Sequence, residues 1–153
     1  MKTYIGISRD HTGSMRGSLA SSAMRDYNSL IGDLKGAAVG ENQDTIVSVV
    51  KCGHGRTVEP YIEVANSYVG TLTPLTNYDA DAPGTALWDS VDTLIDLLSN
   101  TPDANDLQTS FLVMIITDGE ENASKKTTAS KLAERIKKLQ ATDRWSFTFR
   151  TIS

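Results

Sequence analysis

Hydrophobic residues along the chain follow two spacings, a continuous or alternating one typical of strands and a three-to-four-residue one typical of helices. Strand-like segments are predicted at residues 3–8, 45–51, 56–64, 111–117 and 145–152. Helical periodicity is found at residues 14–36, 85–98 and 127–140. Strands that alternate with helices in this way predict an α/β fold.

Two segments indicate how the strands are arranged. The run 111–117 is apolar on both faces, which a strand tolerates when helices cover both sides of the sheet, so we expect it at the centre. Residues 56–64 alternate and contain Pro60, which cannot donate to a central ladder. They follow residues 45–51 after the turn sequence Gly53-His54-Gly55. The predicted fold is a doubly wound, mostly parallel central sheet with helices on both faces and one antiparallel edge hairpin.

The last predicted strand differs from the central one because only one of its faces is apolar. Trp145, Phe147 and Phe149 alternate with polar residues. We therefore expect one face of this strand to be uncovered by any helix. Its edge could pair with a second copy of the chain, which would give a homo-oligomer.

Composition restricts the class of protein. A chain of 153 residues is long enough for one hydrophobic core, so we expect residues 1–153 to be a single domain. It has no apolar run long enough to span a bilayer or form a signal peptide. The only cysteine, Cys52, excludes an intrachain disulfide framework and is expected in the core, so we predict a cytoplasmic protein without membrane association. The net charge of −4 argues against a general nucleic-acid binder.

Oxygen-bearing side chains come together at one predicted edge of the sheet. Asp10, Thr12 and Ser14 follow the first strand, Thr85 opens the second helix and Asp118 follows the run 111–117. Carboxylate and hydroxyl oxygens favour Mg²⁺ or Mn²⁺ over Zn²⁺. Because only two of the five are charged, the ion would remain incompletely neutralised, and the nearby helix N-termini would also favour an anion. The sequence thus predicts a metal site that captures an acidic side chain.

A second interpretation of these residues is helix capping, because Ser, Thr and Asp are favoured at helix N-caps without any metal. Capping explains one such loop well, whereas three loops that each bring oxygen donors to the same edge of the sheet favour a metal site. Cys52 and His54 do not offer an alternative metal site, since two ligands cannot complete a zinc centre.

Asp10-x-Thr12-x-Ser14, Thr85 and Thr117-Asp118-Gly119 resemble the metal-ion-dependent adhesion site (MIDAS) of von Willebrand factor type A (vWA) domains. The segments 83–89 and 117–124 are similar to those of bacterial and phage vWA proteins, and the element order covers nearly the whole chain. The resemblance implies a Rossmann-like vWA fold with Mg²⁺ held by the five residues, the aspartates acting partly through water. Thr12 stands where the family usually has serine. The family also continues past the last strand with a helix and a strand, so we expect a minimal version or a fragment.

The function favoured by these observations is a non-enzymatic interaction module in which Mg²⁺ holds an Asp or Glu of a partner protein. Residues around the metal would form the rim that sets specificity. This partner-binding rim is predicted to contain His11, Met15, Arg16, Asn77, Tyr78, Asp79, Asp81 and Glu120. We interpret His11 as an exposed loop residue.

Two other functions remain open. The first is a Mg²⁺-dependent hydrolase or phosphoryl-transfer enzyme, although the sequence offers no convincing nucleophile or general base. The second is a nucleic-acid-associated adaptor that uses the basic helix 125–138, where Lys131, Arg135 and Lys138 share one face. A solvated helix face explains the same charges.

Overall fold

The computed structural model describes residues 2–41 and 44–152, which contain one five-stranded sheet. The strands are β1 Lys2–Asp10, β2 Asp44–His54, β3 Thr57–Tyr68, β4 Thr109–Thr117 and β5 Trp145–Thr151. The α-helices are α1 Ser18–Glu41, α2 Leu87–Ser99 and α3 Ala129–Gln140, and two 3-10 helices are η1 Gly13–Met15 and η2 Val69–Thr71. The strand order is β3-β2-β1-β4-β5, and every neighbouring pair is parallel except β2 and β3. The predicted sheet with one antiparallel edge hairpin is confirmed.

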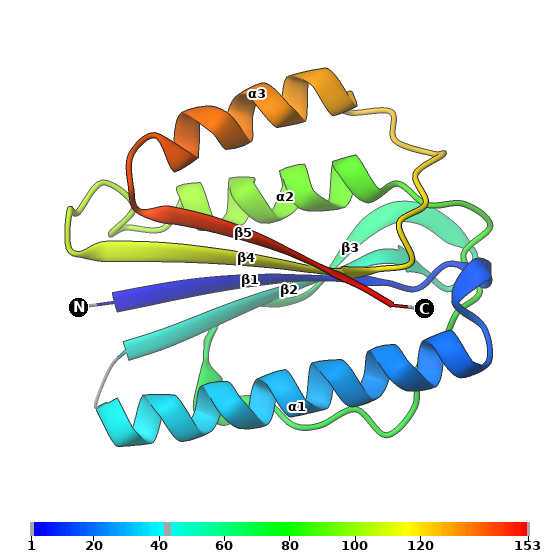
Figure 1. Cartoon of the computed structure of the whole chain (residues 1–153), viewed down its shortest axis with the longest axis horizontal. Coiled ribbons are helices and arrows are strands. Elements are labelled where there is room, and N and C mark those ends of the chain that lie inside the picture. Colours follow the sequence, from blue (N-terminus) through cyan, green and yellow to red (C-terminus); the bar gives the residue numbers. More distant parts are fainter. Residues whose placement is uncertain (1, 42–43, 153) are drawn as a thin grey trace.

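Helices cover both faces of this sheet. Helix α1 lies on one face, and α2 and α3 lie on the other (Figure 1). Alternate side chains of β1 enter the two layers: Ile5 and Ile7 pack on the side of Tyr27, and Tyr4 packs on the side of Leu94. Each face therefore has its own apolar core, as the unbroken hydrophobic runs require.

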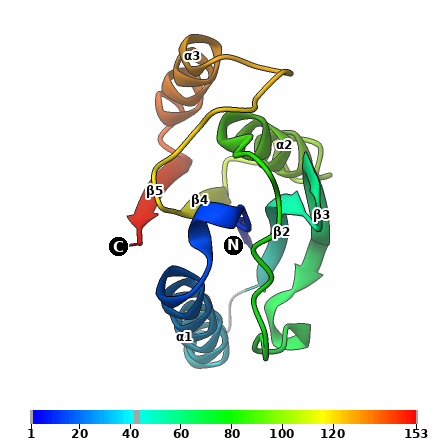
Figure 2. The same ribbon diagram turned by 90° about the vertical axis from the view of Figure 1, so that its right-hand side faces the viewer.

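The winding direction of the chain reverses between β1 and β4. These two strands are neighbours, yet the chain leaves β1 toward α1 on one face and leaves β4 toward α3 on the other (Figure 2). Ligands of open α/β sheets bind where two such loops diverge, beyond the carboxyl ends of the strands. The fold thus places the loops that follow Asp10 and Thr117 at the expected position of a site.

Helix α1 differs from the prediction at both ends. It begins at Ser18 rather than near Ser14, because residues 13–15 form the separate 3-10 turn η1. It also continues through Gly36 to Glu41 instead of ending there. Ala38 lies in the core on the α1 side, and such packing outweighs the cost of about 1 kcal/mol for a glycine inside a helix.

Strand β3 is longer than predicted, because a bulge lets it continue to Tyr68. Asn66 has a positive φ of 45°. Its backbone N–H donates to Ser48 Oγ at 2.8 Å, and Ser48 Oγ donates to Asn66 Oδ1 at 2.9 Å. Ser67 and Tyr68 then pair with β2 beyond the irregularity. The edge position predicted from Pro60 is correct.

The centre of the sheet is β1, and β4 lies beside it rather than at the middle. Most of β4 is nevertheless buried, because α1 covers one face and α2 the other. Helix α3 packs on the rest of the molecule through a narrow part of its surface. Leu132 is buried, whereas Ala129 and Ala133 are exposed.

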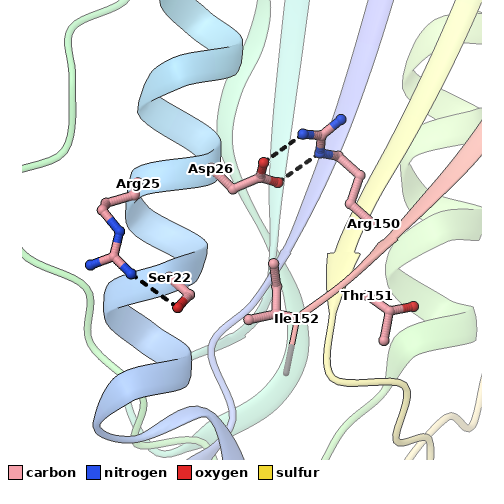
Figure 3. Close-up of a pocket in the computed structure, with 6 residues that line it drawn as sticks. All are labelled: Ser22, Arg25, Asp26, Arg150, Thr151 and Ile152. Carbon is pink, nitrogen blue, oxygen red and sulfur yellow. Dashed lines mark hydrogen bonds and ion pairs between the residues drawn. The ribbon is translucent and has the colours of Figure 1, made fainter.

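Helices cover one face of the edge strand β5, and they do so only near the start of the strand. Trp145 is buried, whereas Phe149 is 50% exposed. On the α1 side, Ser146 and Thr148 are exposed, as predicted for an uncovered face. Arg150 spans the gap to α1 through two hydrogen bonds of 2.6 and 2.5 Å to the Asp26 carboxylate, beside an open cavity of about 600 Å³ (Figure 3).

In the part of the chain that the structure describes, no helix is both long and apolar enough to cross a membrane.

Candidate metal centre

The carboxylate of Asp10 lies at the centre of the predicted site, at the end of β1. Its Oδ1 accepts hydrogen bonds from the Thr12 backbone N–H at 3.0 Å and from Thr12 Oγ1 at 2.7 Å. Its Oδ2 accepts from Thr117 Oγ1 at 3.0 Å. Asp10 is fully buried and Thr12 is 2% exposed, so the orientation of this carboxylate is fixed by its neighbours.

Ser14 connects this carboxylate to the loop after β4. Thr12 Oγ1 and Ser14 Oγ lie 3.0 Å apart, and Ser14 Oγ donates to Asp118 Oδ2 at 2.6 Å. Asp118 Oδ1 accepts the backbone N–H of Glu120 at 3.1 Å. The four predicted ligands of the β1 and β4 loops therefore form one continuous chain of polar contacts.

Thr85 belongs to a third loop, which a distant segment holds in place. The Thr85 backbone N–H donates to Asn122 Oδ1 at 2.8 Å, and the Thr85 carbonyl accepts from the backbone N–H groups of Asn122 and Ala123 at 2.9 and 3.1 Å. The Thr85 residue is 1% exposed. It lies two residues before α2, not inside the first turn as predicted.

An open cavity joins the three loops. It has a volume of about 380 Å³, and Thr12, Ser14 and Thr85 all contribute to its wall. The other lining residues are Gly13, Arg16, Asp81, Ala82, Pro83, Gly84, Glu120 and Asn122. We call it the metal-edge cavity. Three of the five predicted ligands thus face one solvent-accessible space, and the other two are hydrogen-bonded to them.

The electrostatics of the site favour a cation. Burial raises the pKa of the Asp10 carboxyl, the hydrogen bonds from Thr12 and Thr117 oppose this, and the charge of Asp118 raises it further. A buried carboxylate with a second carboxylate nearby is stabilised when a cation lies between them. Five hard oxygen donors fit Mg²⁺ or Mn²⁺.

The site contains few of the side chains that usually hold metals. Within residues 2–41 and 44–152, no group of three or more His, Cys, Asp or Glu side chains is placed to hold a metal. The predicted set has only two carboxylates, and its other donors are hydroxyls. The five ligands therefore remain a prediction that rests on the oxygen geometry.

The helix N-termini do not contribute as predicted. The backbone N–H groups of Trp88 and Asp89 in the first turn of α2 donate to Glu121 Oε1 at 3.2 Å and Ser124 Oγ at 3.0 Å. Since these donors are already used, the start of α2 offers little to an incoming anion. Helix α1 starts four residues after Ser14.

Two of the predicted rim residues are buried and cannot contact a partner. Met15 is 0% exposed and packs in the core on the α1 side. His11, predicted to be exposed, is 2% exposed and stacks on Tyr78 at 4.1 Å between ring centroids. Burial and the nearby Arg9 lower the pKa of His11 to about 3, so its ring is neutral. Its Nδ1 donates to the Asp79 carbonyl at 2.6 Å, because a carbonyl can only accept.

His11 instead helps to fix the loop of residues 78–82 against the β1 loop. Tyr78 Oη donates to the Asp10 carbonyl at 2.5 Å. The Gly13 backbone N–H donates to the Ala82 carbonyl at 2.9 Å. Arg16 Nε donates to the Ala80 carbonyl at 3.0 Å. Of the predicted rim, Arg16, Asn77, Asp81 and Glu120 are exposed, and Tyr78 and Asp79 are half-buried.

Sequence reasoning missed the residues that support the site from a distance. Thr117 orients Asp10, Asn122 holds Thr85, and Asp89 holds the segment after Asp118. The available signal was their position in the two family-like segments, Asp89 in 83–89 and Thr117 and Asn122 in 117–124.

The basic residues of segment 125–138 are only partly free in solvent. Arg135 donates to the Asp92 carboxylate at 2.6 Å and lies 2.8 Å from Asp96, and Lys126 lies 3.2 and 2.8 Å from the same two carboxylates of α2. Two of the basic groups therefore connect α3 and its preceding loop to α2. Lys131 remains exposed.

Solved structures with a similar fold include vWA-type domains. The vWF domain of the type V pili tip protein Mfa5 from Porphyromonas gingivalis matches with a TM-score of 0.55 and 15% identity, over 84% of this chain and 42% of that one. A structure of three N-terminal domains of Mfa5 matches with a TM-score of 0.53 and 15% identity, over 84% and 22%. No family model and no curated protein match the sequence.

The likeness shows the fold. The chain has the vWA-like α/β fold that the element order predicted, and it spans less than half the length of either Mfa5 structure.

Proposed function

We propose that this chain is a protein-interaction module that holds a divalent cation at the carboxyl edge of its sheet and uses it to bind a carboxylate of a partner protein. The observation that supports this most directly is the continuous contact of Asp10, Thr12, Ser14 and Asp118 across two loops, beside a cavity that Thr85 also lines. When bound, Mg²⁺ would supply the positive charge that attracts the partner's carboxylate.

The protein's own residues prepare this site. Thr117 and Thr12 hold both oxygens of Asp10, and the Glu120 N–H holds Asp118, so little side-chain entropy would be lost on metal binding. Tyr78 and Ala82 fix the neighbouring loop to β1. We infer a rigid binding surface whose specificity comes from Arg16, Asn77, Asp81 and Glu120.

A hydrolytic function is less well supported. The only described histidine near the predicted ligands, His11, is buried, neutral and committed to Arg9 and Asp79. Cys52 is fully buried, and burial, chiefly, raises the pKa of its thiol to about 12. Neither group is suited to act as a nucleophile or general base on a substrate in the cavity.

Calorimetric titration of the chain with Mn²⁺ tests the proposal. We expect one site per chain, with an affinity lowered at least tenfold by Ser14→Ala, because that variant loses a hydroxyl in the middle of the contact chain. Ser21→Ala, an exposed position on α1, is the matched control. Mn²⁺ uptake that is unaffected by Ser14→Ala and Asp10→Asn would refute the assignment of these ligands.

A further inference from the structure

A second cavity adjoins the metal edge at the tip of the β2–β3 hairpin. It has a volume of about 490 Å³ and is lined by Arg16, Gly55, Arg56, Asp81 and Pro83. We call it the hairpin cavity. Arg16, Asp81 and Pro83 also line the metal-edge cavity, so the two share a wall and a bound segment could extend from one into the other.

The two cavities differ in the net charge of the residues that line them. Arg16 lies 3.5 Å from the Asp81 carboxylate, and these two opposite charges offset each other. Arg56 is exposed, and among the described residues it has no ion pair or side-chain hydrogen bond. Glu120 lines the metal-edge cavity only. The hairpin cavity is therefore the positive end of the combined surface, and Arg56 supplies the excess charge.

The backbone that carries Arg56 is held in a defined place. Gly55 has a positive φ of 57° at the turn, and Thr57 Oγ1 donates to the His54 carbonyl at 2.9 Å. The His54 ring stacks on Tyr61 at 3.8 Å, and Lys51 Nζ lies 3.1 Å from His54 Nδ1. These contacts fix the hairpin tip beside the metal edge, whereas the Arg56 side chain remains available to solvent.

We propose that the hairpin cavity is a second carboxylate subsite, so that the partner is an extended segment with two acidic residues, one bound at the cation and the other at Arg56. This inference rests on the proposed function and specifies its partner. The planar guanidinium suits a carboxylate because it can donate two parallel hydrogen bonds. The second contact is intramolecular once the first has formed, so even an exposed ion pair increases the affinity.

Synthetic peptides test this directly. One series carries two Asp residues separated by one to five Gly or Ser residues, and a reference peptide carries a single Asp. Binding to the ¹⁵N-labelled chain is measured by NMR titration in Mg²⁺ and in EDTA. At the best spacing, we expect the two-acid peptide to bind about fivefold more tightly than the one-acid peptide in Mg²⁺, as a partly exposed Arg–carboxylate pair predicts.

Substitutions at Arg56 test whether this side chain causes the gain in affinity of the two-acid peptide. The ratio of the two affinities should fall below twofold in Arg56→Gln and be partly kept in Arg56→Lys, which retains the charge without the planar fork. Arg25→Gln is the matched control, because Arg25 is an exposed arginine on α1, beside the cavity of Figure 3. It should keep the full ratio.

The outcomes separate the two proposals. If the one-acid peptide binds equally in Mg²⁺ and EDTA, the proposed function fails. If it binds only with Mg²⁺, but the second Asp gains less than twofold at every spacing or gains as much in Arg56→Gln, the second subsite is overturned and the proposed function stands.

Discussion

Gly53, near the end of β2, shows how a single residue positions the site. Its φ is +99°, and a Cβ at this position would overlap the Cβ of Ala82. Ala82 in turn pairs with the β1 loop, where its N–H donates to the His11 carbonyl at 3.3 Å and its carbonyl accepts from Gly13. The absence of a side chain at Gly53 thus lets the loop before Thr85 lie directly beside the predicted ligands.

We therefore expect Gly53→Ala to destabilise the protein by about 2–4 kcal/mol, the sum of a left-handed backbone cost and an overpacking cost. Urea unfolding measures this free energy. Gly32→Ala is the control: Gly32 lies inside α1, and its added Cβ would meet no atom within 4 Å. That change should stabilise by about 0.5–1 kcal/mol. Equal stability of the two variants would contradict the expected overlap between a Cβ at residue 53 and the Cβ of Ala82.

The residue types in the sequence were sufficient to predict the ligands, but they were not sufficient to predict which residues beside the ligands are buried. Asp10, Thr12 and Ser14 could be placed at a strand end because the preceding residues are an apolar run. Met15 and His11 could not be assigned to the interior, since one apolar and one titratable residue between polar neighbours look like an exposed loop. Met15 is buried in the same core as Tyr27, 12 residues further along the chain, and His11 stacks on Tyr78, 67 residues further along. Local periodicity does not reveal neighbours at these separations.

At the scale of elements, α2 receives its N-terminal cap from a distant segment rather than from its own sequence. Ala86 precedes the helix and has no capping side chain. Glu121 and Ser124 accept the first N–H groups, and Asp89 of the helix accepts the backbone N–H groups of Lys125, Lys126 and Thr127 at 2.7 to 3.1 Å. This reciprocal pairing holds the chain between Asp118 and α3 against α2.

We expect Asp89→Ala to lower the free energy of unfolding by about 3 kcal/mol, because it leaves several backbone donors without their charged acceptor. Native-state hydrogen exchange should show faster exchange at the three amides of residues 125–127. Asp106→Ala is the comparison, since Asp106 holds only the Gln108 N–H, at 2.9 Å in an exposed turn. It should cost less than 1 kcal/mol. Unchanged exchange at 125–127 in Asp89→Ala would count against the pairing.

The order and type of the elements could be predicted because each strand and helix has its own hydrophobic period. Boundaries were less predictable where tertiary contacts decide them. Helix α1 passes Gly36 because Ala38 is buried, and β3 passes residue 64 because Ser48 on the neighbouring strand stabilises the Asn66 bulge. The first turn of α2 was predicted to be open to anions, and only the folded chain brings Glu121 and Ser124 to it.

At the scale of the whole molecule, the predicted ligands come from loops that follow β1 and β4 and precede α2. A cation held by all three would stabilise the folded chain, because the unfolded chain does not bring these loops together. Without a cation, the same arrangement places the buried Asp10 carboxylate near Asp118, whose charge adds to the rise in the Asp10 pKa. Metal binding and global stability should therefore be coupled through this pair.

The substitution Asp118→Asn separates the stabilisation by a bound cation from the repulsion between Asp10 and Asp118. In EDTA we expect the stability of this variant to stay within about 1 kcal/mol of the wild type. The substitution removes a like charge near Asp10 and keeps one oxygen as an acceptor for Ser14, but it replaces the oxygen that accepts from the Glu120 N–H by an amide nitrogen. In saturating Mg²⁺, the wild type should gain about 1–3 kcal/mol, a rise of several degrees in melting temperature, and the variant should gain little. Thermal unfolding followed by circular dichroism in both buffers measures the four values. If Mg²⁺ raises both melting temperatures equally, the cation binds elsewhere, since a ligand carboxylate cannot be neutralised without loss at its own site.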